Sequence, residues 1–87
     1  MKGFVLRLSD DWALGSDPLQ WIVCQRRKLH GETKWQAVSF VESETSILRR
    51  VLYEQGVVAF PEADAALNAF PDSFRKWMNE LPSFGNP

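Results

Sequence analysis

The spacing of the apolar residues changes once along the chain, close to Ser43, and this change constrains the fold more than any other feature. Before it, apolar and polar residues alternate and β-branched or aromatic types dominate, which is typical of strands. After it, apolar residues recur every three or four positions, which is typical of amphipathic helices. The sequence therefore predicts strands first and helices second, the order of an α+β domain.

Three segments in the first half predict the strands, and they cover residues 3–8, 19–28 and 34–42. The second segment is apolar on both faces at its centre, which favours a central place in the sheet. Residues 29–33, with Gly31 in the middle, predict a five-residue hairpin loop. Residues 9–18 are rich in Asp, Ser, Gly and Pro and predict a loop, in which Trp12 and Leu14 lie under the sheet edge.

Three helices are predicted in the second half. Ser43 is the expected N-cap of the first helix, and Gly56 stands where a left-handed glycine ends it. Pro61 suits the first turn of the second helix, because its missing N–H has no partner to lose there. The third helix is expected to begin at residues 71–73 and to end at Pro82.

These elements predict a three-stranded antiparallel sheet followed by two or three helices packed on one face, in the order β-β-β-α-α-α. A chain of 87 residues is short enough for one hydrophobic core. We therefore expect a single α+β domain over residues 1–82 and a flexible C-terminal tail over residues 83–87.

The residues that usually carry catalysis or bind metals are scarce. Cys24 and His30 are the only residues of their types, whereas a zinc site needs three or four ligands and a catalytic triad needs a partnered histidine. Asp10, Asp11 and Asp17 crowd one loop and could hold a divalent cation, but aspartates at turns are more often bonded to nearby backbone. The sequence therefore predicts a protein that is not an enzyme and has no metal or cofactor.

Nothing in the chain indicates export or membrane insertion. The longest apolar runs span four residues, as from Val57 to Phe60, whereas a membrane-spanning helix needs roughly 20. The N-terminus meets a charge after a few apolar residues, and a single cysteine allows no intramolecular disulfide. We expect a cytoplasmic protein with no membrane partner, in a bacterial host cell if the chain is encoded by a phage.

Charge is unevenly distributed, although the net charge is only −1 and excludes a strongly cationic nucleic-acid coat. Residues 20–40 hold four cations and one carboxylate, a local charge of +3, and residues 59–72 hold three carboxylates and no cation. Complementary charge steers and orients partners, so this asymmetry indicates an oriented contact. The basic residues concerned are Arg26, Arg27, Lys28 and Lys34.

An aromatic sheet face is the second indication of a partner. If Val38 and Phe40 face the helices, then Trp35, Ala37 and Val41 lie on the opposite face, which no predicted element covers. Such a face favours docking of a partner or of a second copy, because large exposed apolar patches are rare. The alternative is that every tryptophan packs in the core. The candidate partner-binding residues are Trp21, Trp35, Arg26, Arg27, Lys28 and Lys34.

Two stretches, residues 17–22 (Asp-Pro-Leu-Gln-Trp-Ile) and 35–41 (Trp-Gln-Ala-Val-Ser-Phe-Val), resemble uncharacterised small proteins of phages, prophages and other mobile elements. As a layout the resemblance extends over residues 4–81, and it assigns no functional residues. Many proteins of that class, anti-CRISPR proteins among them, inhibit host machinery stoichiometrically. The resemblance implies a non-catalytic inhibitor that occludes a surface on a host protein or ribonucleoprotein complex. The alternative is a single-stranded nucleic-acid-binding protein that uses the basic hairpin and the sheet aromatics.

Overall fold

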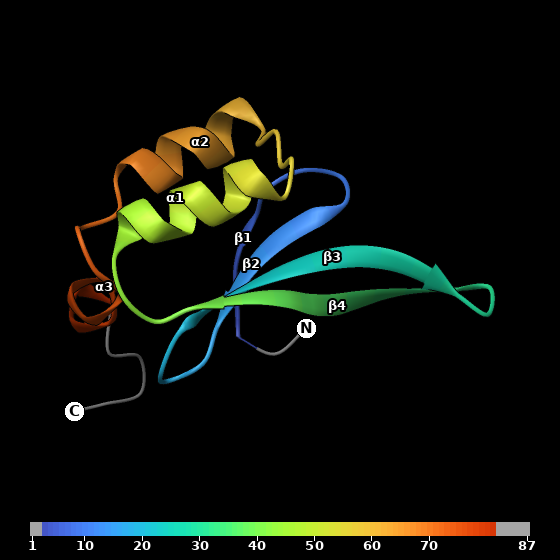
Figure 1. Cartoon of the computed structure of the whole chain (residues 1–87), viewed down its shortest axis with the longest axis horizontal. Coiled ribbons are helices and arrows are strands. Elements are labelled where there is room, and N and C mark those ends of the chain that lie inside the picture. Colours follow the sequence, from blue (N-terminus) through green and yellow to red (C-terminus); the bar gives the residue numbers. More distant parts are fainter. Residues whose placement is uncertain (1–2, 82–87) are drawn as a thin grey trace.

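The computed structural model describes residues 3–81 and shows an antiparallel sheet followed by helices (Figure 1). The strands are β1 (Phe4–Arg7), β2 (Trp12–Ser16), β3 (Trp21–Leu29) and β4 (Glu32–Val41), and the helices are α1 (Thr45–Glu54), α2 (Pro61–Asn68) and α3 (Phe74–Glu80). The strands follow one another across the sheet in the order β1-β2-β3-β4. The α+β class is confirmed, but the described residues form four strands and not three. Pro82 and the tail at residues 83–87 lie outside the described residues.

The additional strand is β2, in the segment that the sequence predicted as a loop. It pairs with β1 on one side and β3 on the other, so it lies inside the sheet. The sequence pattern suggests a turn here, because a strand of five residues that includes a glycine shows little alternation of apolar and polar residues. A glycine suits position 15 because any larger residue would place its Cβ only 3.3 Å from the Gly3 carbonyl oxygen on the neighbouring chain segment.

The hairpin between β3 and β4 is tighter than predicted. Its turn has two residues, His30 and Gly31, with φ angles of 52° and 82°. Two left-handed residues give the backbone twist that matches the twist of flanking strands, which is why this turn type joins long hairpins. Both strands consequently extend to Leu29 and Glu32, which pair directly.

The helix boundaries agree with the predicted signals at three of four positions. Gly56 follows α1 with a φ of 76°, Pro61 is the first residue of α2, and the Ser73 hydroxyl accepts a 3.2 Å bond from the Lys76 N–H at the start of α3. The predicted cap at Ser43 is wrong, because Glu44 occupies the N-cap position and its side chain makes no capping bond. Ser43 instead accepts the Phe74 N–H through its carbonyl, at 2.8 Å.

Trp21 lies at the centre of the core, with none of its surface exposed. Its ring packs edge-to-face on Phe74 with centroids 5.2 Å apart, and it contacts Phe70 and Trp77 with centroids 5.8 Å away. Phe70 follows α2, and the other two rings belong to α3. One strand residue therefore holds both C-terminal helical segments on the sheet. Figure 1 shows α1 and α2 over one face and α3 at the end of the same sheet.

A β-bulge at Val38 decides which residues of β4 face the helices. Val23 pairs with Ser39, whereas the next residue, Cys24, pairs with Ala37, so Val38 is the additional residue of the bulged strand. The bulge reverses the alternation beyond it. Simple alternation would place Phe40 on the face of Val38 and Val41 on the face of Trp35, and the bulge exchanges them: Val41 is buried in the core, and Phe40 is 59% exposed.

Replacing Trp21 tests its central role. We expect Trp21→Ala to lower the free energy of unfolding by about 3 to 5 kcal/mol, because the truncation leaves a cavity among three aromatic rings. Urea denaturation followed by circular dichroism measures the change. Tyr53→Ala is the matched control, since Tyr53 is 85% exposed on α1, and it should alter the unfolding free energy by less than about 0.5 kcal/mol. Equal losses in both variants would contradict this account of the core.

Candidate binding surface on the open face of the sheet

The sheet has one face without helices among residues 3–81, and we call it the open face (Figure 1). Residues paired across neighbouring strands point to the same side of a sheet, so the pairings identify the side chains of this face. One complete row crosses all four strands as Phe4, Gly15, Ile22 and Phe40, and the next as Arg7, Ala13, Cys24 and Ala37. Two shorter rows follow on the hairpin, Arg26 with Trp35 and Lys28 with Thr33.

The first row is apolar and accessible. Phe4 is 56% exposed and Phe40 is 59% exposed, and Ile22 between them is half-buried. Gly15 contributes no side chain, so the row has a shallow centre between two aromatic rings. None of the row's members packs against the hydrophobic core. It is therefore an apolar strip across the whole width of the sheet.

The second row is covered by two long side chains that meet above it. Arg7 starts from the edge strand β1, and its guanidinium carbon lies 5.1 Å from the centre of the Trp35 ring on the opposite edge strand. This cation–π contact spans the strands that carry Ala13 and Cys24. Both small residues are buried although no helix of residues 3–81 covers this face, and we call the Arg7–Trp35 pair above them the roof.

The roof is held by hydrogen bonds. The Arg7 Nε donates to the Ser9 carbonyl oxygen and its Nη2 to the Asp10 carbonyl oxygen, each at 2.7 Å. Beside it, the Arg26 Nη2 lies 3.2 Å from Asp11 Oδ1, and the Arg26 N–H donates to the Asp11 carbonyl. The loop between β1 and β2 therefore fixes both guanidinium groups beside Trp35.

The six candidate residues divide into three places. Trp35, Arg26 and Lys28 share the open face, as a binding surface requires. Arg27 and Lys34 are paired with each other on the opposite side of the hairpin, where Arg27 donates to Gln25 and Lys34 lies 3.6 Å from Glu32. Trp21 is buried in the core, so its side chain is not accessible to a partner.

Four members of the surface were missed by sequence reasoning, namely Phe4, Arg7, Ile22 and Phe40. Alternation groups Phe40 with Val38, and the bulge at Val38, which separates them, leaves no sign in the sequence pattern. Phe4, Arg7 and Ile22 lie in segments correctly predicted as strands, but their common face follows from pairing with β2, which was predicted as a loop. The one local signal for this surface is Arg7, because a long arginine side chain on an edge strand can reach across small neighbouring residues.

Asp10, Asp11 and Asp17, which the sequence favours as turn residues over a cation site, do not form a cluster within residues 3–81. Asp17 accepts the N–H groups of Leu19 and Gln20 and the Gln20 side-chain amide, at 2.8 to 3.0 Å. These bonds, led by that of the Gln20 side chain, hold the pKa of Asp17 below its ordinary value. Asp11 pairs with Arg26. Within residues 3–81 no cluster of three or more His, Cys, Asp or Glu side chains is placed to hold a metal ion.

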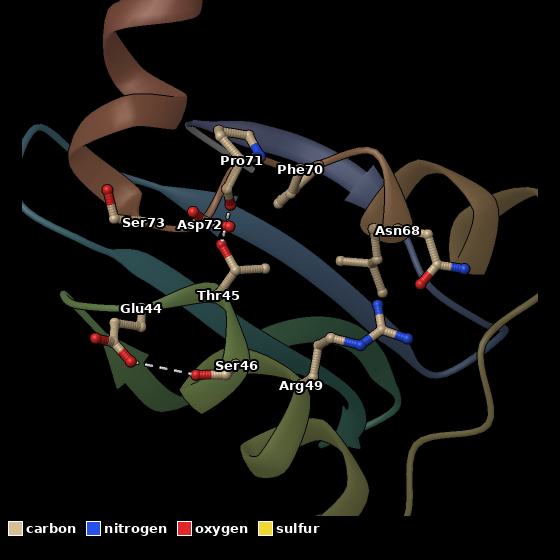
Figure 2. Close-up of a pocket in the computed structure, with 10 residues that line it drawn as sticks. Glu44, Thr45, Ser46, Arg49, Asn68, Phe70, Pro71, Asp72 and Ser73 are labelled. Atoms are coloured by element: carbon tan, nitrogen blue, oxygen red, sulfur yellow. Dashed lines mark hydrogen bonds between the residues drawn. The ribbon is translucent and has the colours of Figure 1, made fainter.

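A hollow of about 560 Å³ lies where the start of α1 meets the connection between α2 and α3 (Figure 2). Its polar groups bond one another: the Thr45 hydroxyl donates to the Pro71 carbonyl, and Ser46 donates to Glu44 at 3.3 Å. Arg49 at its rim lies 3.6 Å from Asp64. The hollow is thus a seam between helices whose polar groups hold those helices together, and the open face remains the stronger candidate.

The roof over Cys24 can be tested through thiol chemistry. Burial raises the pKa of the Cys24 thiol, which keeps it in the unreactive protonated form at neutral and mildly alkaline pH. We expect Arg7→Ala to make Cys24 react several-fold faster with a disulfide reagent near pH 8, because removal of the roof hydrates the thiol and lowers its pKa. The absorbance of the released thiolate gives the rate.

Arg50→Ala is the control for this measurement, since Arg50 is exposed on α1 and away from the open face. Its rate should equal that of the unaltered chain. Equal rates in the Arg7 and Arg50 variants would show that Arg7 does not shield Cys24.

None of the helices in the described part of the chain is long and apolar enough to cross a membrane. Comparison with protein-family models, with curated proteins and with solved structures found no significant match. The open face itself is the candidate site: an exposed aromatic row beside two fixed arginines and a half-buried tryptophan.

Proposed function

We propose that this chain is a small non-catalytic binding module that docks its open face on a protein partner and acts stoichiometrically by occluding that partner's surface. The resemblance to small phage and mobile-element proteins extends the proposal to the kind of partner, a protein of a host complex. In that case the chain is an anti-defence inhibitor, of the same general kind as anti-CRISPR proteins.

The observation that carries the proposal is the apolar row of Phe4, Ile22 and Phe40. Both phenylalanines expose more than half of their surface, and they stand on the paired strands β1 and β4. Exposed aromatic side chains of this size tend to be anchors in protein interfaces, where burying a ring supplies much of the binding energy. A single-layer sheet with such a row gains stability when another surface covers it.

The neighbouring charges suit a role in orientation. Arg7 and Arg26 are already bonded to the β1–β2 loop, so they lose little conformational freedom when a partner arrives. Lys28, one step further along the hairpin, has no ion pair within residues 3–81. A partner that places apolar groups over Phe4, Ile22 and Phe40 and carboxylates over these cations would be held in one orientation.

Single-stranded nucleic acid is the second candidate for the same surface. Bases stack on exposed rings, and antiparallel sheets with one open face serve as platforms for RNA. The specific observation in its favour is that Trp35 lies beside Arg7 and Arg26. Protein is the better-supported partner, because Phe4 and Phe40 belong to an apolar row that holds no cation, and Asp11 neutralises Arg26.

Replacement of Phe40 is the sharpest test of the proposal. We expect Phe40→Ala to weaken binding to the captured partner about 30-fold, the equivalent of about 2 kcal/mol for an aromatic anchor. Partners are captured from bacterial lysate with a tagged chain after nuclease treatment, and the affinity of the purified complex is measured by calorimetry. Phe40 suits this test better than Trp35, whose removal also opens the roof over Cys24.

Tyr53→Ala is the matched control, an exposed aromatic residue on α1 that should bind like the unaltered chain. Circular dichroism and the melting temperature should be unchanged in both variants. Equal weakening in both would overturn the assignment to the open face. Capture that disappears with nuclease would favour nucleic acid, and a molecular mass that doubles with concentration and reverts in Phe40→Ala would favour a homodimer.

A further inference from the structure

The β3–β4 hairpin continues beyond the rest of the sheet as a two-stranded arm. Strand β2 ends its pairing at Gln25, whereas β3 and β4 remain paired through four further pairs, from Arg26–Trp35 to Leu29–Glu32. Figure 1 shows this arm extending past both α1 and α2. At about 3.4 Å per residue the arm projects by roughly 13 Å.

The arm is cationic on both of its faces. It holds Arg26, Arg27, Lys28 and Lys34 against Glu32, a charge of +3, and Asp11 of the β1–β2 loop pairs with Arg26 at the base of the arm. The chain as a whole has a charge of −1, so the remaining residues carry −4. Strand alternation places Arg26 and Lys28 on the open face and Arg27 and Lys34 on the opposite side.

The pairing of Arg27 with Lys34 works against the arm's own stability. The two cations are direct cross-strand partners, and like charges in that position repel each other. Arg27 donates to the Gln25 side chain at 3.1 Å, and Lys34 lies 3.6 Å from Glu32. Arg27 and Lys34 nevertheless remain exposed. A partner that supplies negative charge to both sides of the arm would relieve this repulsion.

We infer that the arm binds duplex nucleic acid by entering the major groove, with its cations directed to the phosphates on the two sides. The major groove is about 12 Å wide and 8.5 Å deep and admits a two-stranded β-ribbon, and the arm is long enough to reach its floor. A flat acidic protein surface would contact one face of the arm only, and would leave the cations of the other face unpartnered.

This inference goes beyond the proposed function and uses other residues. The proposed docking surface depends on the Phe4–Phe40 row, whereas Arg27 and Lys34 lie on the helix side of the sheet. The two proposals can therefore fail separately. If both hold, the arm and the open face together fit an assembly that contains protein and duplex nucleic acid.

The test is fluorescence anisotropy of a short labelled DNA duplex titrated with the full chain. For about three phosphate contacts, the dissociation constant should rise about 40-fold between about 50 and 200 mM salt. Arg27→Glu with Lys34→Glu should weaken binding at least about 10-fold and flatten the salt dependence to about one contact. Phe40→Ala should leave the affinity for the duplex unchanged.

Arg75→Glu with Lys76→Glu is the matched control, because it makes the same change in net charge on exposed residues of α3. It should bind the duplex nearly as tightly as the unaltered chain. Circular dichroism checks the fold of both double variants, and Arg27→Ala with Lys34→Ala replaces the charge reversal if that variant unfolds.

Three results would overturn the inference. The first is no binding of the duplex at low salt, and the second is an equal loss in the α3 control, which would show unspecific attraction. The third is tighter binding of a single strand than of the duplex, which would move the nucleic acid to the aromatic rings of the open face.

Discussion

The contact of Trp21 with Phe70, Phe74 and Trp77 is the interaction on which the remainder of the structure depends. The sheet is a local structure of consecutive antiparallel strands, and the C-terminal helices pack on it through this aromatic cluster and the apolar residues around it. Two backbone bonds tie the start of α1 to the start of α3, from the Thr45 N–H to the Asp72 carbonyl and from the Phe74 N–H to the Ser43 carbonyl, both at 2.8 Å. A domain of this size buries only about 60% of its unfolded surface, so a few large rings carry much of its stability.

Because the helices are committed to one side, the other side of the sheet is left to strand side chains alone. The chain meets this constraint in two ways. Over Ala13 and Cys24 it folds the long Arg7 and Trp35 side chains into a roof, fixed by backbone carbonyls. Over Gly15 and Ile22 it leaves two phenyl rings exposed. Exposed phenyl rings lower solubility and add no evident stability to the fold. The row of Phe4, Ile22 and Phe40 is therefore the part of the open face best explained by a docked partner.

The charge distribution follows the same division of the molecule. The helical side carries the excess of carboxylates, and the cations are concentrated on the hairpin, which pairs with no other strand of residues 3–81 beyond Gln25. Because the arm projects beyond the other strands, its charges stay in solvent, where they change the free energy of folding little. The same separation gives the chain a charged extension with access to a groove, while the body of the protein keeps a slightly acidic surface.

The sequence by itself determined what depends on local chemistry. Apolar spacing predicted β1, β3, β4 and all three helices. The signals at Gly56, Pro61 and Ser73 lie where the helices end or begin, because each acts through its own backbone conformation or hydrogen bonds. Only the tertiary structure decided the faces. The bulge at Val38 arises from the way in which β3 and β4 pair, and it exchanges the faces on which Phe40 and Val41 lie. Strand β2 forms only because β1 and β3 pair with both of its edges. The roof of Arg7 over Cys24 joins the two edges of the sheet, residues 28 positions apart in sequence, and no local pattern encodes a contact of that kind.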